Sequence, residues 1–220
     1  MSAPCTGAIL AGGPSTRFGG EPKGLERVGG QRLIDRAALA LSQAADALLL
    51  IANDPLAEGW LPGVPVAGDV RPRCGSLGGI HAALVRAAER APGAAPAVLV
   101  LAWDMPFVPP GLLRALRALG EGGADAAVPE SGSRRGVEPL CAWYAPSCLP
   151  AIERALDAGD RRAIAFFDRV RVARMPAAEV ARHGDPARLF LNVNSPDELA
   201  LAERHASTPD PRDRRHEEAR

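Results

Sequence analysis

The 220-residue sequence has no excess of charge of either sign, because its 26 basic residues are balanced by 26 acidic ones. A balanced chain carries no overall field that would recruit nucleic acid or a membrane surface. The sequence also lacks an apolar run of the roughly 18 residues that a spanning helix needs, and its start, MSAPCTGAIL, has no basic segment. We therefore expect a cytoplasmic protein without nucleic-acid or membrane partners, in which any anion site is local.

Cysteine is scarce and follows no functional spacing. The four cysteines, Cys5, Cys74, Cys141 and Cys148, form neither a CxxC motif nor a Cys/His cluster with zinc spacing. None of the four histidines falls in a motif that pairs it with a cysteine. We predict free thiols and no cysteine nucleophile.

Glycine, in contrast, is concentrated near the N-terminus, where Ile9 to Lys23 reads ILAGGPSTRFGGEPK. Glycines allow positive φ and close backbone approach, so successive N–H groups can point at one phosphate. Arg17 adds a planar guanidinium with several N–H donors, and Lys23 adds a compact positive charge. Both groups suit the binding of a triphosphate. The spacing matches neither GxxxxGK[ST] nor GxGxxG, and the glycines alone also fit a flexible turn.

This stretch carries a family resemblance. LAGG-x-S-x-R-F/M-G-x-x-K directly after a strand resembles the signature of nucleotidyltransferases, and the LAGG form is most similar to molybdenum cofactor guanylyltransferases. One position departs from that family, because Pro22 stands where an acidic residue usually precedes the lysine and Glu21 lies one step earlier. The resemblance implies catalytic roles for Arg17 and Lys23, and GTP binding by Leu10, Ala11, Gly12, Gly13 and Lys23.

Hydrophobic periodicity predicts the order of the elements. In the first half, residues 32–45 have helical spacing, 47–53 and 64–69 read as strands, a helix follows Gly75 to Ile80, and 97–104 is a buried strand before a helix from about Pro110. This order specifies a three-layer α/β fold with a mostly parallel, Rossmann-like sheet and helices on both faces, as in nucleotidyltransferases.

The second half is predicted to be different. Residues 125–130 and 138–144 read as two strands, a helix that ends or bends at Gly159 follows, and 171–175 is a late strand. We expect one domain over residues 1–206, with a nucleotide-binding N-terminal part, and a disordered charged tail over 207–220. The resemblance implies that about 125–195 bind the acceptor.

Polar residues end several of the predicted strands, at the edge where open α/β sheets bind ligands. Asp104 follows the most apolar strand, and a lone carboxylate there is sufficient for Mg²⁺ when substrate phosphates complete the octahedron. Asn53 also fits a turn-forming Asn-Asp-Pro, and Ser76 fits the N-cap of the next helix. The resemblance implies that Asn53, Asp69 and Asp104 contact the nucleotide, and that Gly75 to Ile80 form a loop that closes over the nucleoside.

The segment NVNSPDEL near the C-terminus has the residue pattern of a helix N-terminus. Ser195 is a good N-cap, Pro196 takes the first helical position, and Glu198 completes a capping box. We predict that Asn192 and Asn194 alternate on a strand and so share a face. The tract resembles the family's NVNTP signature, which implies that both asparagines line the active site.

Taken with the resemblance, these motifs predict a Mg²⁺-dependent enzyme that transfers GMP from GTP to molybdopterin and releases pyrophosphate. An ionised acceptor phosphate needs no general base, which agrees with the absence of a base–nucleophile motif. Transient contact with molybdoenzymes or other cofactor-biosynthesis proteins is a further expectation. Three alternatives stay open: a molybdopterin cytidylyltransferase, a sugar-phosphate or sugar-alcohol nucleotidyltransferase, and a non-catalytic nucleotide-binding protein.

Overall fold

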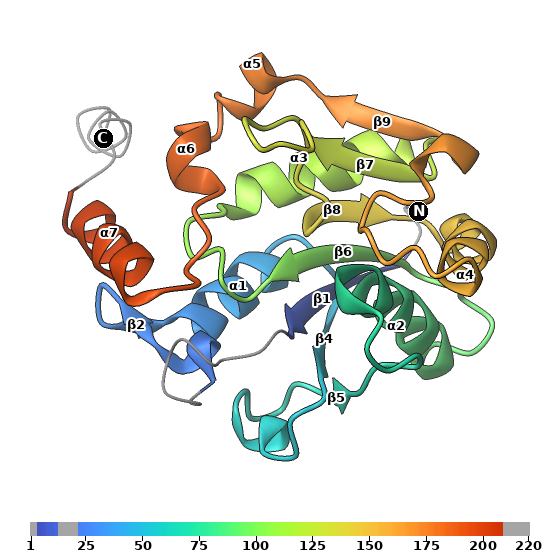
Figure 1. Ribbon diagram of the computed structural model, residues 1–220, viewed down its shortest axis with the longest axis horizontal. Helices are drawn as coiled ribbons and strands as arrows, with labels where there is room; N and C mark the ends of the chain where they lie inside the picture. The colour runs from blue at the N-terminus through green and yellow to red at the C-terminus, as the bar shows by residue number, and fades with distance from the viewer. Residues whose placement is uncertain (1–3, 13–21, 209–220) are drawn as a thin grey trace.

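A computed structural model describes residues 4–12 and 22–208 of the chain (Figure 1). The predictions for Gly13 and Arg17, and for the tail beyond Thr208, lie outside these residues. Ser207, which was assigned to the tail, instead ends a helix. Within the described residues, no helix combines the length and the apolar character that crossing a membrane requires.

A seven-stranded sheet forms the centre of the structure, in the order β5-β4-β1-β6-β8-β7-β9. Its four pairings β5–β4, β4–β1, β1–β6 and β7–β9 are parallel, and β8 runs antiparallel to both of its neighbours. The predicted mostly parallel sheet is therefore confirmed. The strands are β1 (Cys5–Ala11), β4 (Ala47–Ala52), β5 (Val66–Ala67), β6 (Ala97–Ala102), β7 (Ala126–Pro129), β8 (Cys141–Tyr144) and β9 (Val172–Met175).

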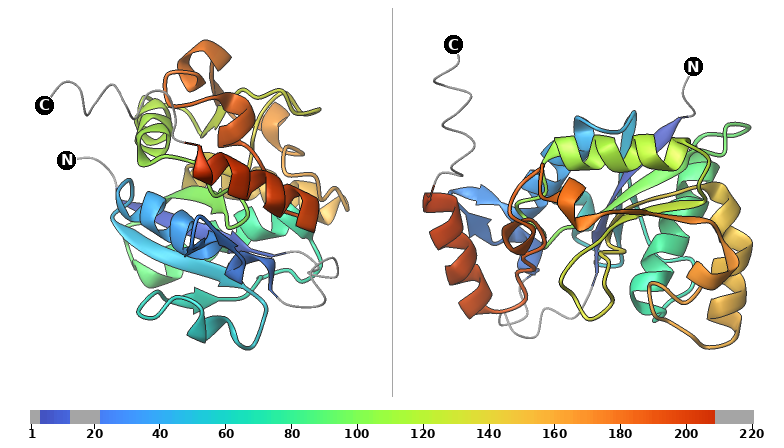
Figure 2. Two further views of the ribbon diagram at one scale, coloured as in Figure 1. Left: turned by 90° about the vertical axis from the view of Figure 1, so that its left-hand side faces the viewer. Right: turned by 90° about the horizontal axis from the view of Figure 1, so that it is seen from above.

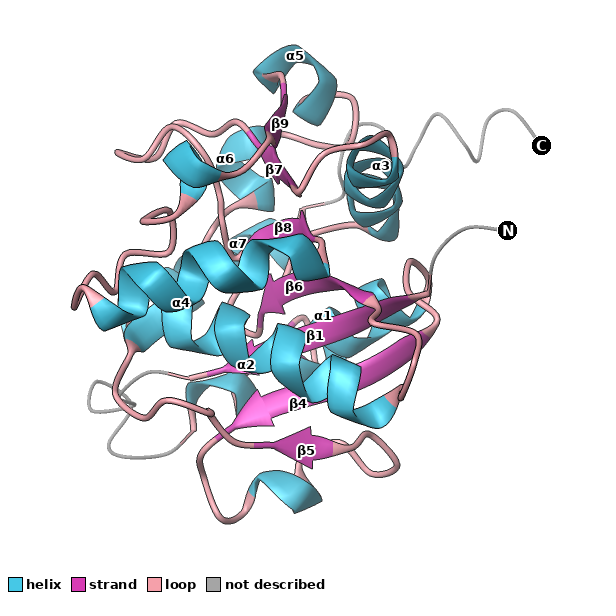
Figure 3. Ribbon diagram, turned by 90° about the vertical axis from the view of Figure 1, so that its right-hand side faces the viewer, coloured by secondary structure: helices cyan, strands magenta, loops and turns pink. Residues whose placement is uncertain are grey.

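Helices cover both faces of the sheet, so that its central strands are buried on both sides. One face packs on α1 (Leu33–Ser42) and α3 (Pro110–Glu121), and the other on α2 (Gly75–Arg90) and α4 (Leu149–Asp157), which lie side by side in Figure 3. Along β6, Leu99 and Leu101 face the first pair of helices while Val98 and Val100 face the second. This two-sided burial explains why the strand reads as a continuous apolar run.

The C-terminal segment returns to the N-terminal part of the chain. Two short helices, α5 (Ala177–Val180) and α6 (Pro186–Leu189), lead to α7 (Pro196–Ser207). Helix α7 lies beside the hairpin of β2 (Arg27–Val28) and β3 (Gln31–Arg32), as Figure 2 shows. A small apolar cluster joins the two, and its buried members are Val28, Leu33, Val193 and Ala202.

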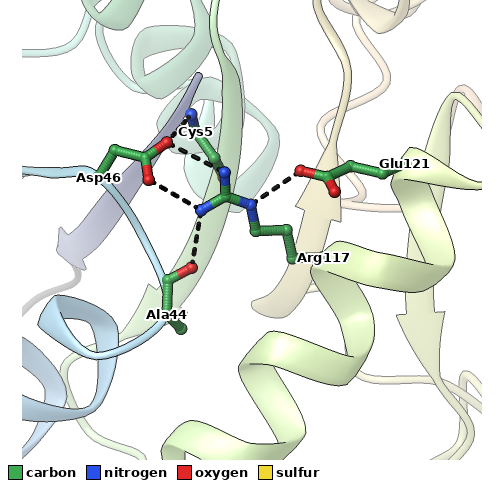
Figure 4. A network of polar contacts seen from close by, with 5 residues as sticks. All are labelled: Cys5, Ala44, Asp46, Arg117 and Glu121. Carbon is green, nitrogen blue, oxygen red and sulfur yellow. Dashed lines mark hydrogen bonds and ion pairs between the residues drawn. The ribbon is translucent and has the colours of Figure 1, made fainter. Parts of the chain in front are cut away.

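One arginine of α3 joins that helix to the amino ends of β1 and β4. The Arg117 guanidinium donates to both carboxylate oxygens of Asp46, at 3.1 and 3.0 Å, to the Ala44 carbonyl at 3.2 Å and to Glu121 at 2.8 Å (Figure 4). Asp46 also accepts a bond of 2.8 Å from the Cys5 backbone N–H. We call these five residues the Arg117 cluster; it fastens α3 to the amino ends of β1 and β4.

Some local predictions were wrong. Ser76 is not an N-cap, because α2 begins one residue earlier at Gly75, whose φ of 59° places it in the left-handed region. Gly75 to Ile80 are consequently the first turns of α2 rather than a loop. Asn192 and Asn194 do not lie on a strand, since residues 191–194 have no regular structure. The four cysteines are free, as predicted.

Candidate active site

Asp104 lies two residues beyond the end of β6, where the chain leaves the sheet. The Trp103 backbone N–H still donates to the Leu10 carbonyl at 3.2 Å, which keeps this segment beside β1. The Asp104 carbonyl accepts a bond of 2.9 Å from the Val193 N–H in the C-terminal segment. These backbone contacts hold the carboxylate in a fixed place with an exposed fraction of only 7%.

Lys23 opens a short 3-10 turn, Lys23–Leu25, whose position depends on a close backbone approach. A Cβ atom on Gly24 would lie 2.0 Å from the indole ring of Trp103, so only glycine lets the turn pack there. Trp103 in turn packs against Trp60, with ring centroids 5.3 Å apart. The turn is thus seated on the aromatic side chain that directly precedes Asp104.

Three side chains from distant parts of the sequence meet at this point, and we call them the Lys23 cluster. The Lys23 ammonium donates to Oδ2 of Asp104 and to Oδ1 of Asn194, each at 2.5 Å. Lys23 is 7% exposed, as is Asp104. A buried charge pair of this kind is costly to desolvate unless it is well hydrogen-bonded, and the Asn194 amide supplies the additional acceptor.

A second pair of polar residues lies at the same edge of the sheet. Asn53 follows β4 and donates from Nδ2 to Oδ2 of Asp69 at 2.8 Å, while its Oδ1 accepts from the Asp69 backbone N–H at 2.8 Å. Asp69 follows β5 in the sequence. The two-way contact fixes the orientation of the Asn53 amide and leaves the pair accessible, since Asn53 is exposed.

A cavity of about 450 Å³ connects these groups at the carboxyl ends of β1, β4 and β6. Its lining combines apolar side chains with a few polar ones, as in sites for small molecules. The described residues that line it are Leu10, Ala11, Gly12, Ile51, Asn53, Asp69, Arg73, Gly75, Ser76, Gly79, Ala102, Trp103, Asp104 and Leu140.

Helix α2 forms one wall, and it carries a buried histidine on the side away from the cavity. His81 is not among the residues that line the cavity, and its Nε2 lies 3.6 Å from Oε1 of Glu153 on α4. Burial lowers the pKa of His81, although Glu153 acts in the opposite direction. A largely neutral imidazole at the α2–α4 contact is therefore a packing group rather than an acid or base for the cavity.

Most of the predicted site residues converge. Leu10, Ala11, Gly12, Asn53, Asp69 and Asp104 line one cavity, and Lys23 donates to both Asp104 and Asn194. Asn192 does not join them through its side chain, because its Nδ2 donates to the Phe190 carbonyl at 3.0 Å. The prediction that the two asparagines alternate on a strand was wrong, because this segment has no regular structure.

The sequence reasoning missed several parts of the site. Arg73, with an unusual φ of 61°, lines the cavity, and no motif had indicated it. Leu140, the residue directly before β8, also lines the cavity, and only the fold brings it there. The β2–β3 hairpin that follows Lys23 was also missed, although the Gly29-Gly30 pair is a hairpin signal, and both glycines have positive φ, 58° and 77°.

The structure is thus a mostly parallel α/β sheet with a buried lysine, a strand-end aspartate and a cavity at its carboxyl edge, which is where α/β proteins of this class bind ligands such as nucleotides. A family model described as "MobA-like NTP transferase domain" matches residues 7–174. The chain therefore belongs to the MobA-like NTP transferases, and it is a nucleotidyltransferase.

Individual relatives agree with this family. The chain is 36% identical over 200 residues to molybdenum cofactor guanylyltransferase of Desulfosudis oleivorans, covering 90% of this chain and 94% of that one. It is also 36% identical over 198 residues to the protein of the same name from Cereibacter sphaeroides, with 90% and 94% covered. A solved structure of molybdopterin-guanine dinucleotide biosynthesis protein A from Archaeoglobus fulgidus has a TM-score of 0.75 at 29% identity, covering 92% and 98%.

Proposed function

We propose that this protein transfers GMP from GTP to molybdopterin, forming a guanine dinucleotide and releasing pyrophosphate. The observation that carries the proposal is the Lys23 cluster, which places a buried cation and a buried carboxylate together beside a cavity of nucleotide size. The names of the relatives, molybdenum cofactor guanylyltransferase and molybdopterin-guanine dinucleotide biosynthesis protein A, support GTP and molybdopterin as the two substrates. Both substrates are anionic, which agrees with the cationic character of Lys23.

The nucleotide would lie in the 450 Å³ cavity. Leu10, Ala11 and Gly12 bring backbone to the end of β1, where N–H groups can approach phosphate oxygens. Asn53 and Asp69 offer a fixed amide and carboxylate for the nucleoside. Lys23, which contacts the cavity-lining Asp104, would hold the phosphates.

In the reaction, an oxygen of the acceptor's terminal phosphate forms a bond to the α-phosphorus of GTP. The bond between that phosphorus and the bridging oxygen to the β-phosphorus breaks, and its electron pair leaves on pyrophosphate. The attacking phosphate is already ionised near neutral pH, so no side chain has to remove a proton. The protein's contribution is to position the two substrates and to stabilise charge, for which Lys23 is placed.

Asp104 fits the requirements of a Mg²⁺ ligand. The described residues contain no group of three His, Cys, Asp or Glu side chains that would form a protein-only metal cage. Mg²⁺ does not need one, because one or two carboxylates, phosphates and waters commonly complete its octahedron. When bound, the ion would polarise phosphate oxygens and neutralise charge on pyrophosphate.

A single assay tests the proposal. The purified protein is incubated with Mg²⁺, molybdopterin-loaded acceptor and each of the four nucleoside triphosphates, and the base in the dinucleotide product is identified together with the released pyrophosphate. We expect incorporation of guanine. Incorporation of cytosine would support the cytidylyltransferase alternative, and the absence of any product with an intact nucleotide affinity would indicate a non-catalytic binding protein.

A further inference from the structure

The Lys23 ammonium uses the carboxylate that is also the candidate metal ligand. Nζ of Lys23 lies 2.5 Å from Oδ2 of Asp104, and both side chains are about nine-tenths buried. An ammonium and a divalent cation repel each other, and they cannot both take their full share of one carboxylate oxygen. A divalent cation that bound to Oδ2 of Asp104 would therefore loosen the contact of that oxygen with Lys23.

Asn194 provides an alternative partner that is already in contact. Its Oδ1 accepts from the same Nζ at 2.5 Å, so that the lysine has a hydrogen-bond acceptor that carries no charge. Among the described residues, Asp104 and Asn194 are the two side chains that accept hydrogen bonds from the Lys23 ammonium. A neutral acceptor suits this task, because it retains the ammonium without attracting the incoming cation as strongly as a second carboxylate would.

The backbone around Asn194 is fixed without any help from Lys23. Its own N–H donates to Oε2 of Glu198 at 2.7 Å, and the neighbouring Val193 N–H donates to the Asp104 carbonyl at 2.9 Å. Glu198 is in turn bound by the Ser195 hydroxyl at 3.2 Å, at the start of α7. The backbone that carries the Asn194 amide would therefore stay in place while the contact between Lys23 and Asp104 changes.

We propose that Asn194 is a positioning residue that retains the Lys23 ammonium beside the cavity when Asp104 takes up a divalent cation. The inference rests on the proposed function only through the assignment of the metal to Asp104. Its consequence is that Asn194 assists metal binding without being a ligand. Removal of the amide leaves Lys23 with Asp104 as its remaining side-chain partner among the described residues, and the lysine then competes with the metal.

The test is a double-mutant cycle with Mn²⁺ as the probe. Free Mn²⁺ is measured by electron paramagnetic resonance in titrations of the wild type, Asn194→Ala, Lys23→Met and the double variant, without nucleotide or pterin. We expect Asn194→Ala to weaken Mn²⁺ binding roughly tenfold, in the range seen for outer-shell partners of metal ligands. In the Lys23→Met background, the same substitution should change the affinity by less than about twofold.

Two further variants and one stability measurement complete the test. Asn192→Ala is the matched control in the same segment, and it should retain wild-type Mn²⁺ affinity because its side chain contacts Phe190 instead. Asn194→Asp keeps an acceptor for the lysine, so its Mn²⁺ affinity should not fall. Thermal unfolding of every variant confirms that the proteins titrated are folded.

Equal weakening by Asn194→Ala in both backgrounds would overturn the proposal, because it would make Asn194 a metal ligand itself. No weakening in either background would overturn it too. The titration contains neither GTP nor the pterin acceptor, so its outcome is separate from the transferase assay. A protein that failed to transfer GMP could still show the predicted coupling, and an active transferase could lack it.

Discussion

The two ends of the sheet each hold a basic side chain between elements, but they do so in different ways. At the amino ends of β1 and β4, the Arg117 guanidinium is bound by two carboxylates and a carbonyl (Figure 4). At the carboxyl end of β6, Lys23 has one carboxylate and one neutral amide. The first arrangement satisfies the cation within the protein, whereas the second leaves it able to change partners.

Burial separates the two clusters as well. The side chain of Asp46 in the Arg117 cluster is 55% exposed, whereas that of Asp104 in the Lys23 cluster is 10% exposed. Water screens the exposed pair, so its contribution is modest and structural. The buried pair lies next to a cavity, where electrostatic effects on a bound substrate are large. Two ion pairs of similar appearance therefore differ in their exposure to water and in their distance from the cavity.

The largest effect is expected from Asp104→Asn, which keeps the shape and an oxygen acceptor for Lys23 but removes the carboxylate charge. The transfer rate should fall at least about a hundredfold, since the proposed Mg²⁺ site loses its protein carboxylate. Steady-state rates at several Mg²⁺ concentrations, with unfolding temperatures alongside, check this. A near-normal rate across those concentrations would remove Asp104 from the metal site.

A smaller loss is expected from Lys23→Met, which preserves much of the stem and its packing while removing the charge. The kcat should fall roughly ten- to a hundredfold, the worth of one charge-assisted hydrogen bond, and more than KM for GTP rises. Kinetics with GTP varied will show the split. Lys23→Arg is the control and should keep partial activity; wild-type constants in Lys23→Met would exclude the lysine from the mechanism.

Arg117→Met is the matching substitution at the opposite edge, and it should affect folding instead of turnover. Loss of its bonds to Asp46 and Glu121 should lower the free energy of unfolding by about 1–2 kcal/mol, discounted for their exposure to solvent. Urea unfolding measures this change. The kcat of the folded enzyme should be unchanged, and a loss of kcat equal to that of Lys23→Met would invalidate the distinction between the two clusters.

The smallest effect concerns pH. The hydrogen bond from Arg117 is the main cause that lowers the pKa of Asp46 below its usual 3.8, so the ionised form is favoured in the folded protein. This stabilisation is present above pH 3.8 and is lost as the pH falls below it, toward the pKa of the folded state.

Asp46→Asn measures that contribution directly. The difference in unfolding free energy between wild type and variant should be less than about 1 kcal/mol at pH 7, because the pair is exposed, and it should shrink in acid. Urea titrations at pH 7, 5 and 3 provide the comparison. A difference that grows toward pH 3 would have the wrong sign and would show that Asp46 is not held ionised by Arg117.

Much of the fold was predictable because its strongest signals are local. The apolar run that precedes Asp104 reads as a strand buried on both faces, and β6 has that burial. Parallel strands bring their carboxyl ends to one edge, and Asn53, Asp69 and Asp104 line one cavity there.

The remaining features depend on contacts that no local pattern encodes. The bond between Lys23 and Asn194 joins residues 171 positions apart, and the fit of Gly24 against Trp103 is a matter of tertiary packing. Ser76 fits the pattern of a helix cap, but it lies inside α2, because the helix begins one residue earlier at Gly75. The resemblance placed Asn192 in the site, whereas its side chain turns back to Phe190.

The long separation between Lys23 and Asn194 has a consequence for synthesis on the ribosome. The lysine emerges 171 residues before the asparagine, an interval of very roughly 10 to 30 seconds at ordinary rates of translation. During that time β1, β4, β6 and their helices are already made, so the sheet can begin to form. The pairing of Lys23 with Asn194 must wait for the segment after α6. A nascent chain arrested before residue 190 would thus lack Asn194 and the hydrogen bond that it accepts from Lys23.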